Sequence, residues 1–208
     1  NLNIPCSKFG EEGLRLQLQL TYADGTTQTF ICDNTWETKP SASTLNGVHA
    51  GEIYNANLET PLWATTEDNS QGWQRAKCIE GPTGMMTAHT APTDKIVESL
   101  KPISLHQRED GAWVVDFGKE ISGWLHLHDL KGEKGDTVKV DYISECVQGN
   151  MRYVMNGSGS EEYAPRFTWF AFSKAVISGD KELSMRNLTA DVVNTHVEKT
   201  ADFHTTDT

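Results

Sequence analysis

Leu14-Arg15-Leu16-Gln17-Leu18-Gln19-Leu20 alternates apolar and polar side chains at every position. Successive side chains of a β-strand point to opposite faces, so this alternation predicts a strand with one face on a core. Residues 23–26 contain a glycine and predict a hairpin turn, and residues 27–32 are the expected return strand. This part of the chain is therefore predicted to be a β-hairpin.

The same style of sequence continues along the chain, with short apolar segments separated by Gly and Pro. Further strands are expected at residues 72–79, 85–89, 112–117, 123–128, 137–143, 167–172, 174–177 and 188–197. Residues 147–162 are rich in Gly, Ser and Asn and predict a long exposed loop. Because no apolar residues recur at helical spacing, we expect an all-β fold of antiparallel β-sandwich or jelly-roll modules.

Two prolines, Pro92 and Pro102, bracket an extended segment in which a module boundary is expected. We divide the chain there into two β-sandwich modules, residues 1–98 and residues 99–208. The first module contains the segment that is richest in candidate binding residues.

Composition limits the function classes. The chain has 208 residues and a formal net charge of -11, without a cluster of Lys and Arg. Nucleic acid and anionic membranes are therefore not expected as partners, and no apolar run approaches the roughly 20 residues that span a bilayer. Residues 1–10 lack the basic start and apolar region of a signal peptide. The chain does not start with Met, so we expect it to be a part of a longer protein.

The four cysteines are widely spaced and form no Cys-x-x-Cys pair, which argues against a zinc ribbon or a redox motif. We expect buried free thiols, although one disulfide stays open as an alternative. The cysteines are Cys6, Cys32, Cys78 and Cys146.

Residues 49–59 read His-Ala-Gly-Glu-Ile-Tyr-Asn-Ala-Asn-Leu-Glu and concentrate polar side chains in a short segment, and two tryptophans follow it. Carboxylates and carboxamides can bind sugar hydroxyls, and aromatic side chains can cover the apolar face of a sugar ring. The alternative is a polar loop with tryptophans in the core, as we expect for Trp36, Trp113, Trp124 and Trp169. The candidate sugar-binding residues are Glu52, Tyr54, Asn55, Asn57, Trp63 and Trp73.

Other chemistry is less well supported by the pattern. Glu52, Asn55 and Asn57 offer oxygen ligands that suit calcium. His126 and His128 would lie on one strand face and could share a metal if a third ligand were close. A glycosidase needs two carboxylates about 5–9 Å apart, and nothing in the spacing brings any two of the candidates together. These carboxylates are Glu52, Glu59, Asp116 and Glu145.

Three motifs occur in an order that is informative. Residues 51–57 are similar to Gly-Glu-x-Tyr-Asp-Ala-Arg, residues 115–124 to Asp-Phe-Gly-x-Asn-x-x-Gly-Trp, and residues 165–172 to Pro-x-Phe-x-x-x-Gly-Phe-Arg-Tyr. In this order they resemble the bacterial α-L-rhamnosidases of glycoside hydrolase family 78. The resemblance covers about residues 14–208.

The resemblance implies β-sandwich modules that precede an (α/α)6 barrel, which carries the catalytic acid and base and is not part of this chain. It implies no hydrolysis by this chain alone, and a segment like the calcium-dependent L-rhamnose binders of carbohydrate-binding module family 67. The implied calcium ligands are Asn55, Asn57 and the neighbourhood of Pro92. The implied partners are a rhamnose-containing carbohydrate and the catalytic barrel of the same polypeptide, in a periplasmic or secreted protein.

Two departures from the family motif weaken the expected site. Asn55 stands where the family has Asp, and Asn57 where it has Arg. Calcium affinity falls with the number of charged ligands. We therefore expect a non-catalytic scaffold with calcium-dependent L-rhamnose binding, or alternatively a purely structural brace. A third hypothesis is a self-sufficient β-sandwich glycosidase or lyase. A fourth is a protein-interaction module of the adhesive sandwich type, which the resemblance argues against.

Overall fold

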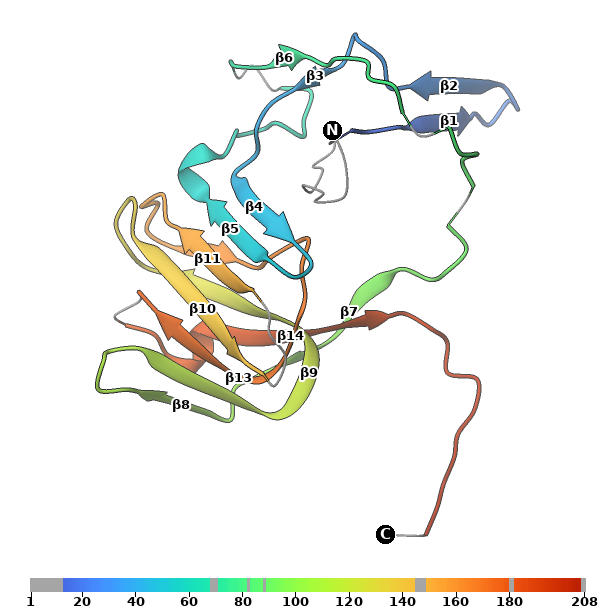
Figure 1. Ribbon diagram of the computed structural model, residues 1–208. Helices are drawn as coiled ribbons and strands as arrows, with labels where there is room; N and C mark the ends of the chain where they lie inside the picture. The colour runs from blue at the N-terminus through green and yellow to red at the C-terminus, as the bar shows by residue number, and fades with distance from the viewer. Residues whose placement is uncertain are drawn as a thin grey trace.

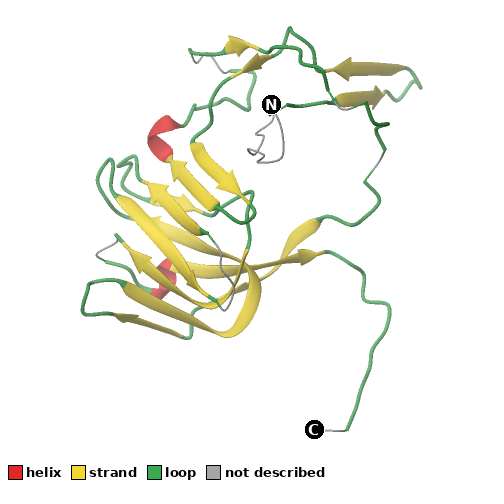
Figure 2. Ribbon diagram, in the orientation of Figure 1, coloured by secondary structure: helices red, strands yellow, loops and turns green. Residues whose placement is uncertain are grey.

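The computed structural model describes residues 13–67, 71–81, 83–87, 89–144, 149–179 and 182–206. Within these ranges the regular structure is almost entirely β, apart from two short 3-10 helices, η1 (Ala56–Leu58) and η2 (Met185–Asn187) (Figure 2). The prediction of an all-β fold is confirmed. In the same ranges, no helix has the length and apolar character that crossing a bilayer requires.

One ten-stranded sheet makes up most of the fold, and it curls because its longest strand, β9, bends strongly (Figure 1). The neighbours are antiparallel except for one parallel pair, β5–β11, where the prediction of antiparallel sheets is wrong. β8 and β12 both pair with β9 outside the main order. In order the strands are β4 (Ser43–Gly47), β5 (Gly51–Asn55), β11 (Asn150–Val154), β10 (Thr137–Ile143), β13 (Phe170–Ser178), β9 (Trp113–Leu130), β14 (Leu188–Thr195) and β7 (Asp94–Leu100), with β8 (Ser104–Gln107) and β12 (Glu161–Tyr163) beside β9.

The hydrophobic core lies on the inner face of this curled sheet. Leu125 and Leu127 are fully buried at alternate positions of β9, whereas the next buried leucine is Leu130, three residues on. The spacing of buried residues thus changes from two to three. This change coincides with a register shift in the β9–β12 pairing and with a left-handed φ of 49° at Asp129. A β-bulge adds one residue to a strand, so it restores the apolar face to the core. Other core residues are Val115, Phe117, Val138, Val140, Phe170, Phe172, Ala175 and Ile177.

Two small two-stranded sheets lie beside the large one, at the top of Figure 1. β1 (Gln17–Thr21) pairs with β2 (Thr27–Ile31), which confirms the predicted hairpin, and β3 (Glu37–Thr38) pairs with β6 (Gln74–Arg75). The expected core face of the first hairpin is wrong, because Leu18 and Leu20 remain 49% and 38% exposed. An isolated hairpin cannot cover its own apolar face.

Several strand predictions need correction. Residues 147–162 contain β11 and β12 instead of a long loop, because Met151 and Tyr153 alternate toward the core within the Gly- and Ser-rich sequence. The described part of residues 85–89 contains no strand, and Met85 is 87% exposed. Residues 72–79 form only the two-residue β6. The two strands expected within residues 112–128 are one continuous β9.

The expected module boundary between residues 98 and 99 falls inside β7, and it stays a prediction. β4 and β5 belong to the first predicted module, yet they extend the sheet of the second through the β5–β11 pairing. The two halves of the chain therefore share one sheet.

Cysteines and tryptophans deviate partly from expectation. Cys32 and Cys78 are free thiols, but Cys78 is exposed rather than buried, and Cys6 and Cys146 lie outside the described residues. Trp113 and Trp124 pack against the core. Trp169 is 48% exposed, so its assignment to the core is wrong.

Candidate functional site

The first part of the predicted binding segment, β5, is built into the sheet on both edges. β5 pairs with β4 in antiparallel fashion on one side and with β11 in parallel fashion on the other. Since side chains alternate along a strand, Glu52 and Tyr54 point to the same, buried face. This placement makes the two residues part of the interior.

Glu52 is the best-connected residue of the segment. Its side chain is fully buried. One carboxylate oxygen accepts a hydrogen bond from the Ser43 hydroxyl at 2.7 Å. The other accepts from the Tyr163 hydroxyl at 2.8 Å and from the Arg166 backbone N–H at 3.2 Å. These donors satisfy a carboxylate whose burial would otherwise be very costly.

Three tyrosines, one of which binds this carboxylate, pack together in what we call the tyrosine–carboxylate cluster. The Tyr54 and Tyr153 rings stack with a centroid separation of 6.0 Å, and Tyr163 lies 4.8 Å from Tyr153. Each hydroxyl donates to a different glutamate, Tyr54 to Glu59 at 2.8 Å and Tyr153 to Glu161 at 2.7 Å. The cluster consists of Tyr54, Tyr153, Tyr163, Glu52, Glu59 and Glu161.

A second buried carboxylate, Glu161, organises the turn before β12. It also accepts hydrogen bonds from the backbone N–H groups of Asn156 at 3.0 Å and Gly157 at 2.9 Å. The Arg166 guanidinium lies 4.7 Å from the centre of the Tyr54 ring, which is favourable cation–π geometry. The cluster thus joins β5, β11, β12 and the segment after β12.

The cluster raises the pKa of its tyrosines. Burial raises the pKa of Tyr163 most, and the adjacent Glu52 carboxylate raises it further. Burial and the hydrogen bond to Glu161 act in the same direction on the pKa of Tyr153. In both cases the folded chain favours the neutral phenol over the phenolate.

We expect the chain to lose stability above about pH 10, because an unfolded tyrosine ionises there while Tyr153 and Tyr163 stay neutral when folded. The stabilisation is fully present below that pH. Each such tyrosine should contribute a slope that approaches about 1.4 kcal/mol per pH unit above it. Urea unfolding at a series of alkaline pH values measures the slope.

The Tyr163→Phe variant should show a smaller alkaline slope than the wild type. Tyr22→Phe is the matched control and should retain the wild-type slope, because Tyr22 is exposed in the folded chain. An unchanged slope in Tyr163→Phe would contradict the assignment.

The two carboxamides form a local cap. Asn55 is the N-cap of η1, and its Oδ1 accepts from both the backbone N–H and the side-chain Nδ2 of Asn57 at 3.0 Å. Asn57 Nδ2 also donates to the Met155 carbonyl at 2.8 Å. Asn57 Oδ1 is buried without a hydrogen-bond partner among the described residues.

The remaining predicted site residues are Trp63, Trp73 and Pro92. Trp63 and Trp73 are half-buried, and the Lys39 ammonium lies 5.8 Å from the centre of the Trp73 ring. Pro92 is exposed. Sugar binding by the six candidate residues and calcium binding at Asn55, Asn57 and Pro92 stay predictions.

The candidate acid and base residues have local roles. Asp116 accepts from the Gly118 N–H at 2.8 Å and pairs with Lys174, and these two contacts lower its pKa, the first more strongly. Glu59 binds Tyr54. Glu145 lies outside the described residues.

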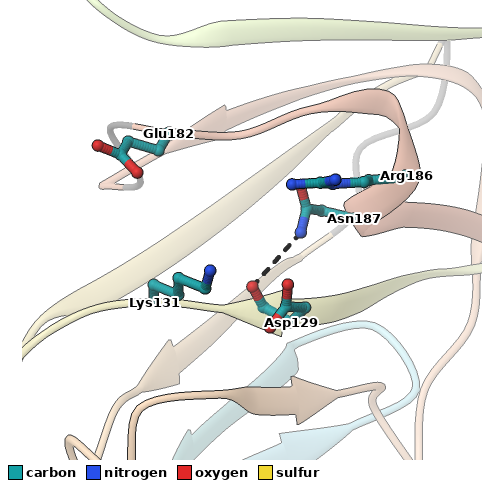
Figure 3. A pocket seen from close by; sticks show the side chains of 5 residues that line it. All are labelled: Asp129, Lys131, Glu182, Arg186 and Asn187. Atoms are coloured by element: carbon teal, nitrogen blue, oxygen red, sulfur yellow. Dashed lines mark hydrogen bonds between the residues drawn. The ribbon is translucent and has the colours of Figure 1, made fainter.

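A small polar cavity of about 60 Å³ lies between the end of β9 and η2. In Figure 3, Glu182, Arg186 and Asn187 lie across from Asp129 and Lys131, and Asn187 Nδ2 donates to the Asp129 carbonyl at 3.4 Å. Ligand pockets usually measure roughly 300–1,000 Å³. This cavity therefore has room for water molecules rather than for a sugar.

A carboxylate lies beside His126 and His128, and it supplies the third group that the sequence analysis could not place there. The Glu162 carboxylate lies within reach of both imidazoles. Glu162 was missed because residues 147–162 were expected to be a loop. Only the pairing of β12 with β9 places it beside the histidines.

Two family models match the chain almost end to end. The α-L-rhamnosidase N-terminal domain matches residues 6–98, and the bacterial α-L-rhamnosidase concanavalin-like domain matches residues 106–194. The chain belongs to the bacterial α-L-rhamnosidase family. The resemblance noted from the motif order is confirmed.

Relatives in this α-L-rhamnosidase family are much longer. An α-L-rhamnosidase of Formosa agariphila is 26% identical over 96% of this chain, which spans 23% of that relative. The α-L-rhamnosidase structure from Dictyoglumus thermophilum has a TM-score of 0.82 at 27% identity, over 88% of this chain and 22% of its own. The structure of the Streptomyces avermitilis α-L-rhamnosidase with L-rhamnose has a TM-score of 0.77 at 23% identity, and the match covers 86% of this chain and 19% of that one. At this identity the likeness shows only that the fold is shared.

Proposed function

We propose that this chain is a non-catalytic β scaffold of an α-L-rhamnosidase, in which the tyrosine–carboxylate cluster joins two domains into one rigid body. A catalytic barrel of the same polypeptide is the proposed partner. The full enzyme would act on a rhamnose-containing carbohydrate.

The buried Glu52 carries this proposal. Glu52 and Ser43 lie in the region that matches the N-terminal domain, and Tyr163 and Arg166 lie in the region that matches the concanavalin-like domain. One fully buried carboxylate therefore accepts hydrogen bonds from both domains. Such contacts are costly to break, so they resist relative motion of the domains.

The buried carboxylates also favour a non-catalytic role. Glu52 and Glu161 are 0% and 5% exposed, and protein donors occupy the oxygens of both. A general acid or nucleophile must reach the glycosidic bond. Neither carboxylate can do so in this fold.

Calcium-dependent L-rhamnose binding is the second candidate, and the unpartnered Asn57 Oδ1 favours it. A buried carboxamide oxygen without a donor is a suitable ligand for a hard cation. The neighbouring Asn55 Oδ1 could join it only by releasing Asn57, whose two nitrogens it now binds.

Two measurements on the folded chain test these functions. The scaffold proposal predicts no release of L-rhamnose from an aryl α-L-rhamnoside, and measurable hydrolysis by the chain alone would overturn it.

Calorimetric titration of L-rhamnose into the chain with calcium, and again with chelator, tests the second candidate function. Calcium-dependent heat that Asn55→Ala removes would support rhamnose binding, and silence in both conditions would exclude it.

A further inference from the structure

Two histidines and a glutamate converge on the outer face of the sheet, away from the tyrosine–carboxylate cluster. His126 and His128 stand two residues apart on β9, so both side chains point to the face opposite the buried Leu125 and Leu127. β12 pairs with β9 and places Glu162 beside them. One ligand atom of each residue lies within 4.8 Å of the other two.

The contacts of Glu162 define where these groups meet. Glu162 Oε1 lies 2.7 Å from His126 Nε2 and 3.4 Å from His128 Nδ1. The two imidazole rings are 4.0 Å apart between centroids. Three groups that bind transition metals thus face one point at the surface.

The neighbouring strand β14 orients both imidazoles from behind. Asp191 is 3% exposed, and its Oδ2 lies 3.1 Å from His126 Nδ1. Thr189 Oγ1 lies 2.8 Å from His128 Nε2. A hydrogen bond from the rear nitrogen of each ring leaves the lone pair of the front nitrogen directed at Glu162.

The surroundings of His126 suit a bound cation. His126 has a carboxylate oxygen at each ring nitrogen, Asp191 on one side and Glu162 on the other. A neutral imidazole has a single N–H, so one of these contacts would set a lone pair against a carboxylate. A metal ion between His126 Nε2 and the Glu162 carboxylate removes that repulsion.

We propose that His126 Nε2, His128 Nδ1 and the Glu162 carboxylate bind one divalent ion of the zinc class, with water as the fourth ligand. Metal–ligand bonds of about 2.0–2.2 Å separate the ligand atoms of a tetrahedral site by about 3.3 Å. The His128–Glu162 pair has this spacing already. The Glu162 side chain is 65% exposed, so it can withdraw from His126 Nε2, which now lies 2.7 Å from its Oε1.

The donor set also selects the metal. Imidazole nitrogen suits zinc, nickel and copper, whereas calcium prefers six to eight oxygen ligands. The site is therefore distinct in chemistry and position from the calcium site considered at Asn55 and Asn57. It does not depend on the proposed scaffold function.

Calorimetric titration of zinc chloride into the chelator-treated chain tests the proposal. We expect one equivalent to bind, and cobalt(II) to give the intense visible absorption of a four-coordinate ion at the same stoichiometry. Glu162→Gln and His128→Gln should each abolish the absorption and the stoichiometric binding. The control His106→Gln changes an exposed histidine on β8 and should bind zinc like the wild type.

Two further readouts separate a metal site from a cluster of hydrogen-bonded side chains. Thr189→Val removes the hydrogen bond behind His128 and should weaken zinc about 10-fold or more, and an excess of calcium should not compete. The proposal would be overturned if the wild type showed no heat of zinc binding. It would also be overturned if Glu162→Gln and His128→Gln bound zinc like the wild type. Glu162 is exposed, so its variant should remain folded, which circular dichroism verifies.

Discussion

The Glu52→Ala variant should unfold with a free energy lower than that of the wild type by about 3–5 kcal/mol. The substitution leaves three donors without an acceptor in the interior, namely the Ser43 and Tyr163 hydroxyls and the Arg166 N–H. An unsatisfied buried polar group costs about 1–3 kcal/mol. Urea unfolding followed by tryptophan fluorescence measures the change.

Two variants control this result. Glu120→Ala removes a glutamate from an exposed position of β9 and should change the free energy of unfolding by no more than about 0.5 kcal/mol. Glu52→Gln keeps the side-chain volume but places an amide nitrogen beside some of the donors. Its free energy of unfolding should therefore lie between those of Glu52→Ala and Glu120→Ala. Equal stabilities of Glu52→Ala and Glu120→Ala would show that the Glu52 contacts are not made in solution.

The Gly51→Ala variant should lose about as much stability as Glu52→Ala, with a free energy of unfolding lower by about 4 kcal/mol or more. Gly51 has a φ of 83°, and a Cβ built there would lie 1.9 Å from the Asn150 carbonyl oxygen. The left-handed conformation accounts for about 1–2 kcal/mol. The remainder comes from separating β5 from β11, because the obstructing atom belongs to the backbone.

Gly135→Ala isolates the conformational part of that effect. Gly135 has a similar φ of 95°, but a Cβ there meets no atom within 4 Å. Its loss should therefore be limited to about 1–2 kcal/mol. If both alanine variants lose the same amount, the close approach of β5 to β11 at Gly51 is not real.

The sequence pattern alone was sufficient to predict a strand where apolar and polar residues alternate along it. Residues 137–143 were predicted as a strand and form β10 at the same residues, because Val138 and Val140 alternate with polar neighbours. β11 was missed because its apolar segment, residues 151–155, is short and is followed by a Gly- and Ser-rich sequence. Tertiary pairing with β5 and β10 stabilises β11 more than its own composition does.

The site could be predicted only in part, for a similar reason. The segment of residues 49–59 was identified as important, but its polar side chains suggested a ligand rather than a neighbouring strand. Glu52 binds Tyr163, which lies 111 residues further along the chain. No spacing rule connects two such positions. Glu162 became a partner of His126 only through the register of β12 against β9.

Native-state hydrogen exchange tests the central claim most directly, which is that β5 is an integral strand of the large sheet. The account predicts that amides of β5 open with the same free energy as those of β11 and β10, and that Glu52→Ala lowers this value for all three strands together. Rapid exchange throughout β5, with β10 and β11 still protected, would contradict it. The segment would then be a peripheral loop free to bind ligand rather than the joint between two domains.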